Sequence, residues 1–175
     1  MCSRSIRRYI DQIAHRAGAI PSISDFYRES SSDYVPGCRA PIVVNNGESL
    51  IIIDKIWGYD ICEKLVYNAR SETFQSKQSF KDNMPCGVLV AGFYEGGQLF
   101  TSIDNVLYMA GLCKNQSFVV LTQDSKDTKI SSYYHRAPIL LDLKTTLPVW
   151  LASKTLPNLK DKQLLQAHEN LYKVA

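Results

Sequence analysis

The chain has 175 residues, a length that suits one domain with a buried core. It is 45% hydrophobic and 21% charged, as soluble globular proteins are, and no apolar run approaches the roughly 20 residues that span a bilayer. The five cysteines include no CxxC pair, which argues against a disulfide framework or a zinc ribbon, and the net charge of +3 is compatible with nucleic acid without being diagnostic.

The first predicted element is an amphipathic helix over residues 4–17, where apolar side chains recur at helical spacing. Gly18 is expected to end this helix, and Pro21 to keep it from resuming. The following residues, 22–38, are polar and predict a loop with little regular structure. The amino terminus also lacks the apolar stretch of a signal peptide, so we expect an intracellular, cytoplasmic protein.

From residue 40 onward the pattern becomes that of β-strands. Two apolar runs flank Asn46-Gly47, a strong hairpin signal because both positions tolerate positive φ. The other strand candidates are 86–95, 98–103, 105–113, 117–123 and 137–143, with turns at Gly96-Gly97 and 114–116. A short helix is predicted over 146–152, and a second amphipathic helix over 159–173.

The order of these elements defines the expected fold class. The strands do not alternate with helices, so a parallel sheet of βαβ units is disfavoured. We therefore expect an α+β protein, a single domain over 1–175 with a mainly antiparallel, partly closed β-sheet or barrel flanked by helices. Residues 153–175 are expected to be a helical extension.

The second residue is chemically distinctive. Aminopeptidases generally remove Met1 when a small residue such as Cys2 follows it, and the chain would then begin with a free cysteine. Its α-amine and its thiol have pKa values of about 8 and 8.5, so both are partly deprotonated near neutral pH. An aldehyde would form a Schiff base with the amine, and the thiolate would then close a thiazolidine ring.

Several polar positions are candidates for a site, and each has a plain structural alternative. Asn68 to Glu72 reads as an exposed loop with an Arg–Glu contact, and Glu95 as a charged strand terminus. His135 reads as a structural histidine, and Trp57 as a core tryptophan at a strand end. Taken one at a time, none of these positions decides between the two readings.

Taken together, these motifs resemble the SRAP family, the "SOS response-associated peptidase" domain. The matching elements run in family order over about residues 1–152. They are Met1-Cys2-Ser3-Arg4, Trp57-Gly58, Asn68-Ala-Arg-Ser-Glu-Thr73, Lys77-Gln-Ser-Phe80, Gly92-Phe-Tyr-Glu95, Ala110-Gly-Leu112, His135-Arg-Ala-Pro-Ile-Leu140 and Trp150-Leu151. Three departures stand out: Ser3 replaces a family glycine, Gly96 replaces a family tryptophan, and Tyr59-Asp60 follows Trp57-Gly58 in place of Leu-x-Pro.

The resemblance implies a function and assigns roles to residues. Members of the family recognise abasic sites in single-stranded DNA and crosslink to them through the amino-terminal cysteine. By this resemblance Cys2 is the nucleophile, Asn68 orients the sugar or the amine, Glu95 shuttles protons, and His135 helps to open the deoxyribose ring.

The DNA contacts follow from the same resemblance and from the logic of single-strand binding. Arg4, Arg70 and Arg136 are the phosphate candidates, and Trp57 is the stacking candidate. The expected partner is abasic single-stranded DNA, with no cofactor, no metal, no membrane and a monomeric state. Two alternatives stay open: an amide hydrolase with an amino-terminal nucleophile, and a module that binds single-stranded DNA without chemistry.

Overall fold

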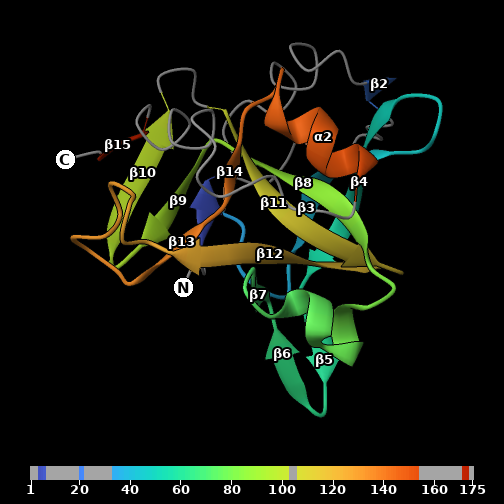
Figure 1. The fold of residues 1–175 in the computed structure, drawn as a ribbon, viewed down its shortest axis with the longest axis horizontal. Helices are drawn as coiled ribbons and strands as arrows, with labels where there is room; N and C mark the ends of the chain where they lie inside the picture. Colours follow the sequence, from blue (N-terminus) through green and yellow to red (C-terminus); the bar gives the residue numbers. More distant parts are fainter. Residues whose placement is uncertain (1–3, 7–19, 22–32, 103–105, 154–170, 174–175) are drawn as a thin grey trace.

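The computed structural model describes residues 4–6, 20–21, 33–102, 106–153 and 171–173 (Figure 1). The strands are β1 (Ser5–Ile6), β2 (Ile20–Pro21), β3 (Arg39–Asn45), β4 (Leu50–Trp57), β5 (Tyr59–Ile61), β6 (Lys64–Val66), β7 (Asn68–Arg70), β8 (Met84–Val90), β9 (Gly92–Glu95), β10 (Gln98–Ser102), β11 (Leu107–Lys114), β12 (Ser117–Asp124), β13 (Arg136–Pro138), β14 (Leu140–Leu141) and β15 (Leu171–Lys173). The helices are the 3-10 turns η2 (Phe74–Ser76) and η3 (Gln78–Phe80) and the α-helix α2 (Thr146–Ala152).

The main sheet is mixed and closes partly on itself. Its strand order is β13-β12-β11-β8-β3-β4-β2, and β12 also pairs in parallel with β4, at Ser117 with Ile56 and Phe118 with Trp57. The five strands β12, β11, β8, β3 and β4 therefore form a ring, and every other pairing within this ring is antiparallel. The expectation of an α+β domain with a mainly antiparallel, partly closed sheet is confirmed.

The ring is filled by apolar side chains, and α2 covers one side of it (Figure 1). The indole N–H of Trp150, on α2, donates to the carbonyl oxygen of Cys86, on β8, at 2.9 Å. Because a buried N–H without a partner is costly, this bond holds the helix in one place on the sheet. No helix in the described part of the chain is long and apolar enough to cross a membrane.

The tight turns lie where the sequence predicts them. Asn45 and Asn46 side chains accept hydrogen bonds from the backbone of the turn between β3 and β4, and Gly47 has a φ of +97°. Gly96 and Gly97 have positive φ between β9 and β10, as Asn115 has between β11 and β12. These residues adopt that conformation with little strain, which explains why the three hairpins are readable in the sequence.

Both predicted terminal helices differ from the structure where it describes them. Ser5–Ile6 is a strand, β1, that pairs antiparallel with β9, and Leu171–Lys173 is a strand, β15, that pairs with β10. Both pairings satisfy backbone groups on the edges of the small sheet β1-β9-β10-β15, and this tertiary pairing prevails over the local helical spacing. The rest of both predicted helices lies outside the described residues.

Two predicted strands are each divided in two. The run 86–95 changes sheet at Ala91, so that β8 belongs to the main sheet and β9 to the small sheet. The run 137–143 is divided at Ile139, whose N–H donates to Leu121 of β12 and whose carbonyl accepts from Ala110 of β11. An apolar run reports burial but not the point at which a strand leaves one partner for another.

Candidate functional site

The strand β1 brings the amino-terminal segment to the end of β9. Ser5 lies opposite Phe93, Ile6 lies opposite Gly92, and the Tyr94 N–H donates to the Arg4 carbonyl at 2.9 Å. The antiparallel direction of this pairing puts Arg4 at the Tyr94–Glu95 end of β9. Cys2 lies outside the described residues.

Arg4 itself lies on the surface beside β9. Its guanidinium stands over the Tyr94 ring, 4.7 Å from the centroid, and pairs with the Asp33 carboxylate at 2.6 Å. Its side chain is still 54% exposed, so a further ligand can approach it. A cation over an aromatic face is stabilised electrostatically, which orients the guanidinium beside the end of β9.

Glu95 is a buried acid at the end of β9. Only 1% of the residue is exposed, although the glycines of the turn follow it directly. Burial raises the pKa of the Glu95 carboxyl above its ordinary value, and the charge of the amino terminus lowers it in part. A carboxyl group of raised pKa is a candidate for exchanging a proton with a neighbouring amine.

The turn after Glu95 packs against the segment that carries His135. Gly96 has a φ of +56°, and a Cβ added there would stand 2.5 Å from the Tyr133 carbonyl oxygen. The ring of Tyr133 also contacts the ring of Phe100 on β10, with centroids 5.6 Å apart. Glu95 is one residue before this contact in the sequence, and His135 is two residues after it. The contact also explains the glycine at 96, since a tryptophan there would collide with the Tyr133 backbone.

His135 is exposed, and its ring lies against the ring of Tyr134, 4.4 Å between centroids. Tyr134, directly before it in the sequence, is the other ring of this segment. Tyr134 is half-buried and packs against the core. The role of His135 stays a prediction, and Tyr134 is a neighbouring ring to which the sequence assigned no role.

The Asn68–Thr73 motif begins as a strand and not as a loop. β7 pairs in parallel with β12, with Asn68 opposite Val120 and Arg70 opposite Thr122. Asn68 is half-buried, Ala69 is buried and Arg70 is exposed. This confirms the extended geometry in which Asn68 and Arg70 share a face. The exposed guanidinium of Arg70 is available to a phosphate.

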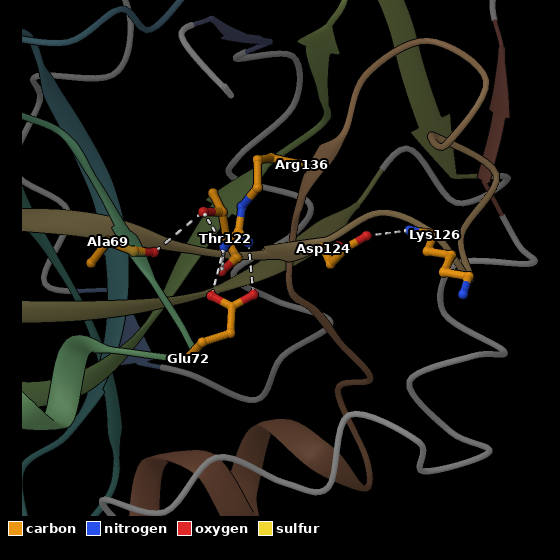
Figure 2. Close-up of polar contacts among 6 residues, drawn as sticks. All are labelled: Ala69, Glu72, Thr122, Asp124, Lys126 and Arg136. Atoms are coloured by element: carbon orange, nitrogen blue, oxygen red, sulfur yellow. Dashed lines mark hydrogen bonds and ion pairs between the residues drawn. The ribbon is translucent and has the colours of Figure 1, made fainter.

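Glu72 and Arg136 join this motif to the His135 segment. Two nitrogens of Arg136 donate to the two oxygens of Glu72 at 2.7 and 2.9 Å, and Figure 2 shows the two groups facing each other. Arg136 also donates to the carbonyl of Thr122 at 2.6 Å, and the Thr122 hydroxyl donates to the Ala69 carbonyl at 3.3 Å. Three segments distant in sequence therefore meet at Thr122.

This network changes the interpretation of Arg136. Its side chain is only 12% exposed and most of its donors are used within the protein, so its first role is to hold the site together. Its Nε–H and the Ser71 hydroxyl are buried and have no hydrogen-bond partner among the described residues. The sequence assigned no role to Ser71, Glu72 or Thr122. Ser71 and Glu72 lie in the polar cluster Asn68 to Glu72 that the sequence offered as a candidate, and in the six-residue motif match.

Trp57 lies in the core, and the structure does not place it as a stacking surface for DNA. The residue is 2% exposed, its indole N–H donates to the Tyr67 carbonyl at 2.9 Å, and its ring stacks on Phe118. Tyr67 immediately precedes Asn68, so this hydrogen bond holds Trp57 against the residue just before β7. The core alternative for this tryptophan is the one that its burial favours.

The structure thus brings Arg4, Glu95 and the His135 segment together at the end of β9, and brings the Asn68 motif to the same segment through Arg136. In the described part of the chain, no group of three or more His, Cys, Asp and Glu side chains is arranged to hold a metal ion. The arrangement is one acid of raised pKa at the end of β9, with the exposed guanidinium of Arg4 beside the same end. Such a site suits proton transfer at an amine next to an anionic ligand.

The comparisons with known proteins agree with this arrangement. The sequence profile of the family described as "SOS response associated peptidase (SRAP)" matches residues 1–175, and the chain belongs to this family. A crystal structure of a protein from Bordetella bronchiseptica has the same fold, with a TM-score of 0.73 and 19% identity over 100% of each chain. No curated protein matches this chain. Family membership associates the chain with the response to DNA damage, with DNA binding and with a peptidase-like activity.

Proposed function

We propose that this protein captures abasic sites in single-stranded DNA by a covalent bond to Cys2, after removal of Met1. The observation that supports the proposal is the pairing of β1 with β9, which places Arg4 beside Tyr94, next to the buried Glu95. An amino-terminal cysteine has two nucleophiles on adjacent carbons, and the open form of an abasic sugar is an aldehyde. The acid of raised pKa supplies the proton transfers that join them.

The reaction balances with no oxidant or reductant. The Cys2 amine adds to the aldehyde carbon, and the resulting carbinolamine loses water to give an imine. The Cys2 thiol then adds across the C=N bond: sulfur bonds to the carbon and the nitrogen regains a proton. The sum is aldehyde plus aminothiol giving thiazolidine plus water.

Glu95 would serve two steps of this sequence. As a carboxylate it accepts a proton from the ammonium group and frees the amine to attack. As the acid it donates that proton to the departing hydroxyl of the carbinolamine. Burial holds its pKa above the ordinary value, which keeps both forms accessible closer to neutral pH.

The remaining residues would bind and orient the strand. Asn68 would hold the sugar or the amine, and His135 would help to open the deoxyribose ring. Arg70 and Arg4 would contact phosphates, since both are exposed, and Arg136 would add its Nε–H while keeping its ion pair with Glu72. We expect little sequence preference, because phosphate contacts carry no base information.

The test is a denaturing gel with an oligonucleotide that carries one abasic site. Protein with Met1 confirmed absent should give a heat-stable shifted band with the lesion and none with undamaged DNA. Cys2→Ala should give no band, whereas Cys38→Ala, which removes an exposed thiol elsewhere, should crosslink as the wild type does. Glu95→Gln should slow the reaction by about 10²–10⁴-fold, the usual range for a lost acid–base group.

Further arms separate the alternatives. An amino-terminal extension that blocks the amine should abolish the band, whereas a non-covalent binder would still shift on a native gel. Release of product from a peptide or amide substrate with turnover, and no band with DNA, would favour the peptidase reading that the family description offers. His135→Ala beside Tyr134→Phe would show which of the two side chains acts on the sugar.

A further inference from the structure

The loop between β12 and β13 presents an aromatic ring beside the candidate site. In the described part of the chain, Tyr133 is the one exposed aromatic residue, with 39% of its surface accessible. Figure 1 shows this loop beside β10, where the Tyr133 ring contacts the ring of Phe100, 5.6 Å between centroids. Trp57 is buried, so among the described aromatic residues Tyr133 is the most accessible to a base.

Contacts within the loop and with β15 hold the Tyr133 backbone in place. The Tyr133 N–H donates to the carbonyl of Ile130 at 2.8 Å, and Ile130 is buried. The Lys129 ammonium, from the same loop, donates to the Leu171 carbonyl of β15 at 3.1 Å. A surface that is already fixed loses less conformational entropy when a ligand binds to it, so Tyr133 is preorganised for contact.

A cation stands next to this ring. The Lys173 ammonium, on β15, lies 5.2 Å from the centroid of the Tyr133 ring, and Lys173 is exposed. The pairing of β15 with β10, with Lys173 opposite Phe100, fixes the backbone that carries this cation. The ammonium is on a flexible four-carbon stem, so it can turn from the ring to a phosphate when a base covers the ring. Aromatic rings beside cations are the combination by which proteins bind single-stranded nucleic acids.

The ring and the cation lie next to the proposed reaction site. The Tyr133 carbonyl oxygen would stand 2.5 Å from a Cβ at Gly96, the residue directly after Glu95. Since consecutive Cα atoms are roughly 3.8 Å apart, this oxygen is within about 8 Å of the Glu95 Cα. A nucleotide that flanks a sugar held at Glu95 is therefore within reach of the Tyr133 side chain.

We infer that Tyr133 and Lys173, here called the Tyr133 platform, bind the nucleotide next to the abasic one. Its base lies against the Tyr133 ring, and its phosphate contacts the Lys173 ammonium. The inference rests on the proposed function, because a strand captured near Glu95 supplies this nucleotide. Stacking needs only the flat face of a base, so the platform accepts all four bases.

The test is a binding measurement that does not depend on Cys2. A thymidine oligonucleotide with one central tetrahydrofuran residue, an abasic analogue without an aldehyde, binds to the full chain and is followed by fluorescence anisotropy. A second tetrahydrofuran then replaces one thymidine at a time, which removes a single base. Removal of a base directly beside the central position should weaken binding by the wild type at least about fivefold, the lower end of the stacking contribution of one base.

Tyr133→Leu completes the comparison. Leucine keeps an apolar side chain against Phe100 but has no flat ring, and the Tyr133 carbonyl and Cβ still contact Gly96. This variant should bind the singly substituted oligonucleotide at least about fivefold more weakly than the wild type, and removal of the neighbouring base should cost it less than about twofold. Tyr133→Phe, which keeps the ring, should behave as the wild type does. If base removal at both neighbouring positions affects the wild type and Tyr133→Leu equally, the inference is wrong.

Lys173 is tested through the salt dependence of the same binding. Lys173→Gln should reduce the slope of log K against log salt by about 0.7, the value for one phosphate contact with a single strand. Lys144→Gln, at an exposed lysine before α2, is the control and should leave the slope unchanged. An unchanged slope for Lys173→Gln as well would contradict the phosphate contact.

The crosslinking experiment separates this inference from the proposed function. If the wild type gives no heat-stable band while a neighbouring base still couples to Tyr133, the covalent chemistry falls and the platform stands. If the band forms and neither neighbouring base couples to Tyr133, the proposed function stands and the platform falls. Absence of binding to any of these oligonucleotides would refute both.

Discussion

The Glu72 carboxylate and the Arg136 guanidinium form a two-pronged ion pair across β12, although the two residues are 64 positions apart in sequence. Arg136 is 12% exposed and Glu72 is 45% exposed in their side chains, so the pair is shielded on one side only. It joins the motif that begins at Asn68 to the segment that holds His135. The relative position of these two candidate site residues therefore depends on an ion pair that touches neither of them.

Breaking this pair should cost measurable stability. We expect Glu72→Gln to lower the free energy of unfolding by about 1–2 kcal/mol, since it weakens a charge-assisted, partly shielded bidentate contact. Urea unfolding of both single variants and the Glu72→Gln/Arg136→Gln double variant measures the coupling. The exposed pair Lys114–Asp82, at 3.7 Å, is the matched control and should couple by less than about 0.5 kcal/mol. Equal couplings would contradict the shielding argument.

The stability of the protein should depend on Glu95 with a definite sign. Its pKa in the folded protein is raised above the ordinary value of 4.5, so the folded state binds more protons between the two values. The free energy of unfolding therefore falls as the pH rises through that window. Relative to Glu95→Gln, which does not titrate, the wild type should lose stability in urea unfolding as the pH rises above 4.5 toward the raised folded-state pKa.

In the same experiment, Glu72 should make the stability change with pH in the direction opposite to that of Glu95. The hydrogen bond from Arg136 lowers the pKa of Glu72 below its ordinary value. Its contribution to the free energy of unfolding is thus present above pH 4.5 and is lost as the pH falls through the lowered pKa of the folded protein. Relative to Glu72→Gln, the wild type should lose stability toward acid, and the same direction for both acids would refute these assignments.

Gly96 and Gly97 should differ in their tolerance of a side chain. Both have positive φ, +56° and +77°, but an added Cβ meets the Tyr133 carbonyl at 2.5 Å only at position 96. Gly97→Ala should cost about 1 kcal/mol from backbone strain alone, and Gly96→Ala about 1–2 kcal/mol more. Thermal unfolding of the two variants isolates the contact with Tyr133. Equal losses would mean that the Tyr133 backbone moves away from the added Cβ at no measurable cost in stability.

Trp57 should behave as a core residue. Trp57→Phe removes the bond to the Tyr67 carbonyl and leaves a cavity, so we expect a loss of about 1–3 kcal/mol in urea unfolding. Trp150→Phe, which loses the corresponding bond to Cys86, should lose a similar amount. Below the unfolding transition, both variants should bind single-stranded DNA as the wild type does. Weaker binding by the Trp57 variant alone would restore its stacking role.

Arg70 should contribute to DNA binding through charge. If its guanidinium contacts one phosphate, Arg70→Ala should reduce the slope of log K against log salt by about 0.7, the value for a single strand. Fluorescence anisotropy with an undamaged oligonucleotide, over a range of salt, gives this slope. Lys144→Ala, an exposed lysine before α2, is the control and should leave the slope unchanged.

The sequence by itself determined the features that depend on local chemistry. Asn46-Gly47 and Gly96-Gly97 specify turns: Gly47, Gly96 and Gly97 adopt positive φ with little strain, and the Asn46 side chain accepts hydrogen bonds from the backbone of its turn. The apolar runs specify buried strands, and residues 146–152 form the predicted helix α2. The matched motifs led to the family that the profile comparison confirms. All of these signals lie within a few consecutive residues, where spacing is enough to read them.

Tertiary structure alone decided which edges and side chains meet. The spacing over 4–17 favours a helix, yet Ser5–Ile6 pairs with β9, because an edge strand with open backbone groups gains from a partner. Arg136 is a free cation in the sequence but an ion-pair partner of Glu72 in the fold. The sequence leaves Trp57 available as a stacking surface for DNA, whereas in the fold the residue is only 2% exposed. Contacts between distant residues determine burial and charge pairing, and a local pattern does not encode them.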